Sequence, residues 1–180
     1  TADYAFHRMK DRPFWVVETS SGGGQGAWAN QGILQPYPGA LRQNAIHAVA
    51  CGAEVVTYFQ WRMFRYGAEQ LEAAVMDIDG LPRRRHKEFQ QAAAEMRDLT
   101  ELLESSKVKS DAAICWDYDS LWAIKIKPFR KGFNYTVQMN QISAALARHG
   151  IGADVIPCTE AIRKYRMVIL PTQVIVDEPF

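Results

Sequence analysis

A glutamate at the tip of a short apolar run is the residue of this chain best suited to catalysis. Glu18 follows four consecutive apolar residues, FWVV at 14–17, and precedes a loop with four glycines at 20–26. The β-branched and aromatic residues predict a strand that is buried on both faces. A carboxylate at the carboxyl end of such a strand lies where α/β barrels and open α/β sheets gather their catalytic side chains. Glu18 is therefore the leading catalytic candidate, and a solvated strand-end glutamate is the alternative.

The glycine-rich loop suggests a second chemistry, because glycine-rich turns after strands can hold phosphates. The run lacks the Lys-Ser/Thr ending of a P-loop and the third glycine of a dinucleotide fingerprint, and no helical pattern follows it at once. A nucleotide-binding protein that uses residues 22–26 is thus the less favoured hypothesis. It predicts stabilisation by nucleotide in a thermal melt, and we expect none.

Elements on either side of the loop must position Glu18. Residues 1–12 read as the end of a helix leading into the first strand, and apolar residues recur at helical spacing from Leu41 to Val49. A second apolar run at 54–59 completes a βαβ unit, which implies parallel pairing. The second strand ends in aromatic residues at 58–61. Aromatic rings beside a carboxylate are typical of sugar-binding sites, although core aromatics would give the same pattern.

The segment after the second strand carries two further carboxylates, Glu69 and Glu72. Considered by residue type alone, both are expected on a solvated face. The basic run at 83–87 is likewise expected to be a solvated helix start. A helical stripe of apolar residues follows over 88–104, and the polar link at 105–110 predicts a domain boundary.

The second half of the chain predicts the opening part of a doubly wound parallel sheet. Strands are expected at 112–116, 153–156 and 167–170, with a helix between Asn134 as N-cap and Gly150, and a short helix near 159–165. Cys115 and Cys158 raise the alternative of a thiol enzyme. Neither cysteine has the glycine-flanked turn that such a nucleophile needs, so buried structural thiols are favoured.

Composition excludes several classes of function. The chain has 180 residues with 48% hydrophobic content and a net charge of +1, which gives no broad field to attract nucleic acid or a membrane surface. Three widely spaced cysteines form neither a disulfide framework nor a metal site, which favours a reducing, cytoplasmic compartment. The chain begins on Thr1 next to the candidate catalytic strand, so we expect a fragment of a longer protein.

Several stretches, taken in order, resemble the glycoside hydrolase family 42 β-galactosidases. In the first half they are FWVVE at 14–18, the loop reaching Trp28, the PxPG-helix-GA segment at 36–53, YFQWR at 58–62 and AEQ at 68–70. The second half resembles that family's trimerisation domain through DYD at 117–119, LWA at 121–123 and RKYRMVILP at 163–171. The resemblance implies the last strands and helices of a (β/α)8 TIM barrel at 1–104. A partial flavodoxin-like or amidotransferase-like parallel α/β sandwich, the trimerisation domain, would follow at 105–180.

The resemblance also implies roles for particular residues. Glu18 matches the catalytic nucleophile, Trp28 and Phe59 match rings of the galactose subsite, and Glu69 matches a carboxylate that binds sugar hydroxyls. Glu72 stands where a histidine is expected, which puts the preferred sugar in question because a carboxylate accepts hydrogen bonds but does not donate them. The implied partners are a galactoside substrate and two further copies of the chain, with no metal and no cofactor.

In this family the acid/base glutamate follows an asparagine, and the chain contains no Asn-Glu pair. We therefore expect it to carry only the nucleophile half of a catalytic site. The alternative is a non-catalytic oligomerisation module derived from such an enzyme.

Overall fold

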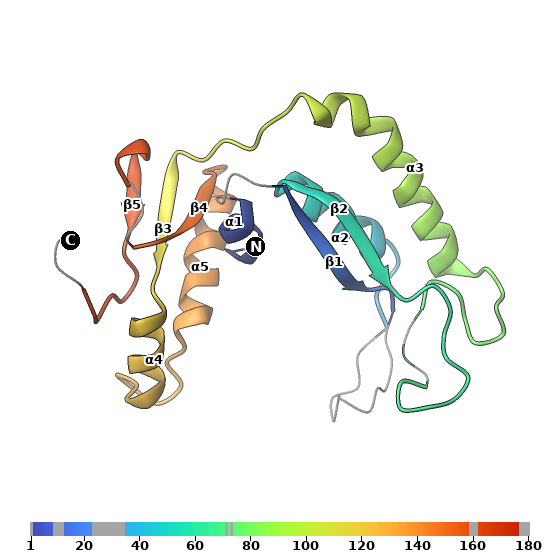
Figure 1. Cartoon of the computed structure of the whole chain (residues 1–180), viewed down its shortest axis with the longest axis horizontal. Coiled ribbons are helices and arrows are strands. Elements are labelled where there is room, and N and C mark those ends of the chain that lie inside the picture. The colour runs from blue at the N-terminus through green and yellow to red at the C-terminus, as the bar shows by residue number, and fades with distance from the viewer. Residues whose placement is uncertain are drawn as a thin grey trace. The chain divides into compact units, whose positions relative to one another are not determined.

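The chain folds into two compact units that both contain parallel strands and helices. The computed structural model describes residues 2–8, 13–22, 35–70, 72, 74–158 and 162–176. We call residues 13–107 the strand-pair unit, and residues 2–8 together with 108–176 the three-strand unit (Figure 1). The predicted α/β class with parallel sheets is confirmed. No helix among the described residues is long and apolar enough to cross a membrane.

The strand-pair unit contains the predicted βαβ arrangement. Its elements are β1 (Phe14–Ser20), α2 (Ala40–Ala50), β2 (Ala53–Phe59) and α3 (Arg84–Glu104), and β1 pairs with β2 in parallel. Gly52, with φ of +99°, makes the left-handed turn between α2 and β2 that a residue with a Cβ rarely adopts. The Tyr58 hydroxyl donates a hydrogen bond of 2.6 Å to the Leu41 carbonyl, and the Tyr58 ring meets Phe89 edge-on. These contacts attach α2 and α3 to one face of the strand pair.

The other face of β1 has no cover among the described residues. Phe14 and Val16 are half-buried, whereas Trp15 is 61% and Val17 is 74% exposed. The prediction that this strand is buried on both faces is therefore wrong for this chain. The physical reason is that the helices of the unit lie against one side of a sheet that has two strands in the described part of the chain. A parallel pair with an apolar second face needs further structure to complete it.

The three-strand unit contains a parallel sheet in the order β4-β3-β5. Its strands are β3 (Ala112–Trp116), β4 (Ala153–Pro157) and β5 (Met167–Ile169), and its helices are α1 (Ala2–Arg8), α4 (Tyr118–Ile126) and α5 (Tyr135–Arg148). The predicted cap of α5 is confirmed, because Asn134 Oδ1 accepts a 3.1 Å hydrogen bond from the Val137 amide. A 3-10 turn, η1 (Ile162–Lys164), falls within the predicted short helix, whose residues 159–161 lie outside the described chain.

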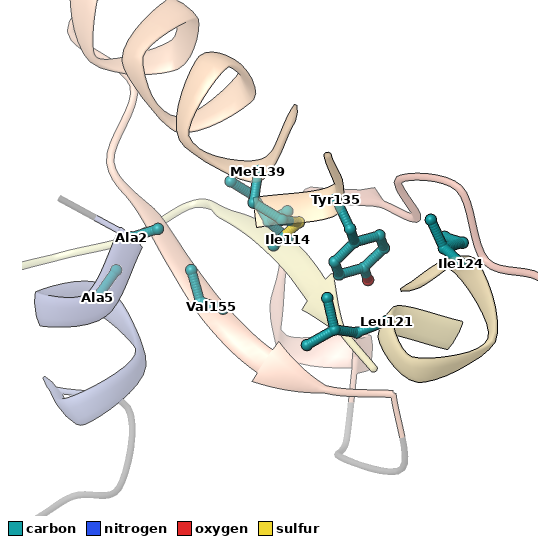
Figure 2. Close-up of a cluster of buried hydrophobic side chains, with 8 residues drawn as sticks. All are labelled: Ala2, Ala5, Ile114, Leu121, Ile124, Tyr135, Met139 and Val155. Atoms are coloured by element: carbon teal, nitrogen blue, oxygen red, sulfur yellow. The ribbon is translucent and has the colours of Figure 1, made fainter. Parts of the chain in front are cut away.

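The core of this unit forms on both faces of β3, the central strand. Figure 2 shows Tyr135 and Met139 of α5 around Ile114, and Ala2 and Ala5 of α1 beside Val155. On the opposite face Ala113, Cys115 and Ile156 are fully buried. Alternate residues of β3 thus supply two separate apolar clusters, as expected for a strand with both faces covered.

Helix α1 belongs to the three-strand unit although it precedes β1 in the chain. Arg8 donates hydrogen bonds to Asp154 Oδ1, at 2.8 Å from its Nη2 and 3.3 Å from its Nε. The same guanidinium donates to Ser110 Oγ and to the Ala153 carbonyl, and the Tyr165 hydroxyl donates to Asp154 Oδ2 at 2.9 Å. The division of the chain at residues 104 and 105 stays a prediction. The structure adds that the helix before the first strand packs on β4.

Candidate active site

Glu18 lies in an irregularity of β1 near the carboxyl end of the strand pair. Val16 pairs with Val56 and Thr19 pairs with Tyr58, so β1 has one residue more than β2 between these pairs. Such a bulge changes the direction of the side chains that it contains, and bulges recur next to active sites. The Glu18 side chain is exposed, and no ion pair or side-chain hydrogen bond holds it among the described residues. The carboxylate is thus accessible to a ligand.

A buried serine fixes the ends of the two strands to each other. Ser21 is fully buried, and its amide and hydroxyl donate to the Phe59 carbonyl at 3.0 Å and 2.8 Å. The sequence predicts that Ser21 lies in the glycine-rich loop, and it gives no direct indication of this role. The only signal for it was a small polar residue between an apolar strand and glycines.

The structure brings Glu18 and one of its predicted ring partners to the same edge. Phe59 is the last residue of β2, is half-buried, and pairs with Ser20 two residues beyond Glu18. The second predicted ring, Trp28, lies outside the described residues. Neighbouring aromatics serve the fold instead: Tyr58 faces the helices, and Trp61 contacts His86 and Phe89 of α3.

Glu69 and Glu72 lie on a loop whose base is closed beside the end of β2. The Val75 amide donates to the Gln60 carbonyl and the Met76 amide to the Trp61 carbonyl, both at 2.8 Å. Both glutamates are half-buried rather than fully solvated, and the Glu72 amide donates to the Glu69 carbonyl at 3.2 Å. No described interaction joins either carboxylate to Glu18 or Phe59, so their shared site stays a prediction.

The basic run at 83–87 is not simply a solvated helix start, and that expectation is wrong for Arg85. Arg85 is 8% exposed, and its guanidinium donates to Gln35 Oε1 at 3.0 Å and to Asp77 Oδ1. Burial lowers the pKa of Arg85. Gln35 follows the glycine-rich loop and Asp77 follows the loop that carries Glu69. One buried guanidinium thus holds the ends of two loops at the carboxyl side of the strands.

Arg83 and Arg84, the neighbours of Arg85, also bind the residues at the ends of these two loops. Arg84 donates to the Pro36 carbonyl at 2.9 Å, and Arg83 donates to both Asp77 and Asp79. The hydrogen bonds from Arg83 hold the pKa of Asp79 down at about 2. Asp79 therefore stays ionised at any pH at which the protein would act.

The two candidate thiols of the three-strand unit behave as structural side chains. Cys115 is fully buried, and Cys158 packs against the same apolar cluster. Burial raises the pKa of the Cys158 thiol to about 12 and also raises that of Cys115. Thiols of this kind are not nucleophiles at neutral pH, which supports the structural interpretation of Cys115 and Cys158.

Comparison with known proteins identifies the family. Residues 2–99 match the family model described as β-galactosidase, glycoside hydrolase family 42, and residues 110–180 match the model of the β-galactosidase trimerisation domain. The β-galactosidase BgaA of Clostridium cellulovorans is 32% identical over 180 residues, which cover 97% of this chain and 27% of that protein. BgaH of Haloferax lucentense is 36% identical over 169 residues, covering 94% of this chain and 24% of the relative.

Solved structures agree with the sequence relatives. The β-galactosidase of the psychrophilic Marinomonas ef1 superposes with a TM-score of 0.85 at 27% identity, covering 97% of this chain and 28% of that one. The enzyme of the Antarctic haloarchaeon Halorubrum lacusprofundi superposes with a TM-score of 0.82 at 35% identity, covering 94% and 25%. The chain spans about a quarter of the length of these relatives. The chain therefore belongs to the glycoside hydrolase family 42 β-galactosidases.

Proposed function

We propose that this chain carries the nucleophile half of the active site of a retaining β-galactosidase, with Glu18 as the nucleophile. The observation that carries the proposal is the position of Glu18, an exposed carboxylate in a bulge near the carboxyl end of a parallel strand. Carboxyl ends of strands are where barrel enzymes place their catalytic groups. The family supplies the substrate class, a terminal β-D-galactoside.

In this proposal β1 and β2 are the seventh and eighth strands of a (β/α)8 barrel. The uncovered face of β1, with Trp15 and Val17 exposed, supports this, because barrel strands are covered on one side by helices and on the other by the packed interior. The three-strand unit would be a partial flavodoxin-like sandwich. Its strand order β4-β3-β5 is the 2-1-3 order with which that fold begins.

The chemistry needs two carboxyl groups about 5 Å apart. The ionised Glu18 attacks the anomeric carbon while a protonated acid gives its proton to the glycosidic oxygen, and the bond between that oxygen and the sugar breaks. A covalent galactosyl-enzyme results. Water, deprotonated by the second carboxylate, then attacks the same carbon and releases galactose and Glu18. Because the sequence contains no Asn-Glu pair, the acid/base group is expected from residues outside this chain.

The remaining subsite residues act by contact. Trp28 and Phe59 would stack on the sugar ring, and Glu69 would accept hydrogen bonds from its hydroxyls. Glu72 would accept such bonds at the position where the resemblance implies a histidine, so the preference for galactose is the property that this residue would change. The assembly would be a homotrimer through the three-strand unit. No metal, cofactor, nucleic acid or membrane takes part, and a cytoplasmic location stays a prediction.

A chimera tests the nucleophile. The matching quarter of the Halorubrum lacusprofundi enzyme is replaced by this chain, which is 35% identical to it. We expect the chimera to hydrolyse o-nitrophenyl β-D-galactoside and Glu18→Gln to reduce its turnover on the order of 10⁴-fold, because the covalent step is lost. Azide should restore turnover to Glu18→Ala by replacing the carboxylate as nucleophile, with an α-galactosyl azide as product.

Glu54→Gln is the matched control, because Glu54 is also an exposed strand glutamate but lies at the amino end of β2. Its turnover should equal that of the parent chimera. Full activity of Glu18→Gln would contradict the assigned nucleophile, and an inactive parent chimera would favour the non-catalytic module. Turnover by the 180-residue chain alone would refute the proposal that the acid/base residue lies outside this chain.

A further inference from the structure

Of the three consecutive arginines at the start of α3, Arg85 is the one that bonds, within the described chain, to the ends of both loops at the carboxyl edge of the strand pair. Arg83 donates to aspartates after the loop that follows β2, and Arg84 donates to a backbone carbonyl after the glycine-rich loop. Arg85 donates to both sides, to Asp77 Oδ1 and, at 3.0 Å, to Gln35 Oε1. We call Arg85, Gln35 and Asp77 the Arg85 link.

The cation of the Arg85 link is buried, unlike those of its neighbours. The side chain of Arg85 is 9% exposed, whereas those of Arg83 and Arg84 are 52% and 41% exposed. A guanidinium presents its donors in a rigid planar fork, and its hydrogen bonds are stronger where water is excluded. Arg85 therefore restrains the two loop ends more firmly than either neighbour does.

The Asp77 end of the Arg85 link fixes the base of the loop that carries Glu69. Two amides beside it, those of Val75 and Met76, donate at 2.8 Å to carbonyls just beyond the end of β2. Ala74 and Val75 are buried at the same place. A loop that is held at its base moves with that base, so the position of Glu69 depends on where the base is held.

The Gln35 end of the Arg85 link follows the glycine-rich loop. Gln35 is exposed, and its contact with Arg85 spans fifty positions of the chain, whereas the contact of Arg85 with Asp77 spans eight. One side chain thus fixes two segments that are distant in sequence to the carboxyl side of the strands. Glu18 lies near that same end of β1.

We infer that Arg85 is a positioning residue of the galactoside site, an inference that rests on the proposed function. Its guanidinium holds the loop with Glu69 at a fixed separation from the segment that follows the glycine-rich loop. Arg85 itself would contact no substrate and would act through Asp77 and Gln35. Because a displacement of about 1 Å can cost on the order of 100-fold in rate, loss of the link should weaken sugar binding in molecules that remain folded.

The chimera with the Halorubrum lacusprofundi enzyme tests this role through the inhibition constant of galactose. As a competitive inhibitor of o-nitrophenyl β-D-galactoside hydrolysis, galactose reports how well the binding groups are placed, and its inhibition constant does not depend on the amount of enzyme. Labelling of Glu18 by 2,4-dinitrophenyl 2-deoxy-2-fluoro-β-D-galactoside counts the functional sites separately. A purely structural role of Arg85 would lower that count and leave the inhibition constant unchanged.

Arg85→Met should raise the inhibition constant on the order of tenfold, because both hydrogen bonds of the Arg85 link are lost. Gln35→Ala removes one of them at an exposed position and should raise it about threefold. The double variant should match Arg85→Met alone, since both substitutions break the same link. Arg42→Met is the control: it removes an exposed arginine that joins α2 to α3 through Glu95, and the constant should equal that of the parent.

The outcomes separate this inference from the proposed function. An inhibition constant equal to the parent's in both Arg85→Met and Gln35→Ala would overturn the inference, even if the melting temperature falls. If Arg85→Met gives no labelled sites, Gln35→Ala decides alone: a raised constant supports the link, and an unchanged constant overturns it. A parent chimera that neither hydrolyses the substrate nor becomes labelled at Glu18 would refute the proposed function, and this inference with it.

Discussion

Asp154→Ala should detach helix α1 from the three-strand unit. The carboxylate accepts two hydrogen bonds from Arg8 and one from Tyr165, and both side chains of the ion pair keep only a small exposure, 17% for Arg8 and 14% for Asp154. Substitution removes the negative charge that Asp154 places against the largely buried guanidinium of Arg8. Arg8 is also the last residue of α1, so this loss falls where the helix meets β4.

These contacts give the expected loss in the free energy of unfolding on Asp154→Ala. Breaking a buried ion pair from one side costs about 3–5 kcal/mol, because an uncompensated charge is left behind. Arg8 retains Ser110 Oγ at 3.0 Å and the Ala153 carbonyl at 3.1 Å, and water reaches part of it. We therefore expect a loss of about 2–3 kcal/mol in the free energy of unfolding. Tyr165→Phe removes one hydrogen bond to the carboxylate and should cost about 1 kcal/mol.

Urea unfolding followed by tryptophan fluorescence measures these losses. Replacing Trp15, Trp28 and Trp61 by phenylalanine restricts the signal to Trp116 and Trp122 of the three-strand unit. A double-mutant cycle of Asp154→Ala with Arg8→Met should give a coupling energy of about 1.5 kcal/mol. A coupling below about 0.3 kcal/mol would refute the reasoning, because the ion pair between Arg8 and Asp154 would then contribute little to the attachment of α1.

Three further predictions concern buried groups. Arg85→Met should destabilise the strand-pair unit by about 2 kcal/mol, because Gln35 and Asp77 lose a buried partner; an unchanged urea midpoint would contradict the role of Arg85. Burial raises the pKa of Tyr58 from 10 to about 12. The neutral Tyr58 phenol therefore contributes fully to the free energy of unfolding below pH 10, and this contribution is lost as the pH rises toward 12. Absorbance at about 295 nm should show one phenol fewer titrating near pH 12 in Tyr58→Phe, and titration near pH 10 would refute the assignment. Iodoacetamide at pH 8 should alkylate Cys51 before Cys115 and Cys158, since the Cys158 thiolate is on the order of 10⁻⁴ of the total at a pKa of about 12; equal labelling by mass spectrometry would be inconsistent with that burial.

Local signals in the sequence were enough for most of the elements. Asn134 predicted the start of α5 because a short amide side chain can accept from the amide three residues on, and the structure shows that bond. Helix α4 was not predicted, although its signal is of the same kind. Asp117 accepts hydrogen bonds from the Asp119 and Ser120 amides, yet in the sequence it reads as the charged end of a strand.

Features that depend on distant partners could not be predicted in this way. Arg85 is buried in a contact with Gln35, which lies fifty residues earlier in the chain. No local sequence pattern around Arg85 predicts that contact. The bulge at Glu18 depends on the register between β1 and β2, which a run of apolar residues does not specify. Glu18 could be proposed as a candidate from the apolar run before it, and its catalytic role stays a prediction.

The attachment of α1 makes the three-strand unit discontinuous along the polypeptide. Arg8 and Asp154 are 146 positions apart, so during synthesis the helix leaves the ribosome long before its docking site on β4 exists. Residues 2–8 cannot dock until β4, in the second half of the chain, has formed. Closing so long a loop adds an entropic cost to folding. An expression clone that starts at residue 108 would lack part of its own interior, and adding the seven-residue helix back as a separate peptide should raise its yield of folded protein.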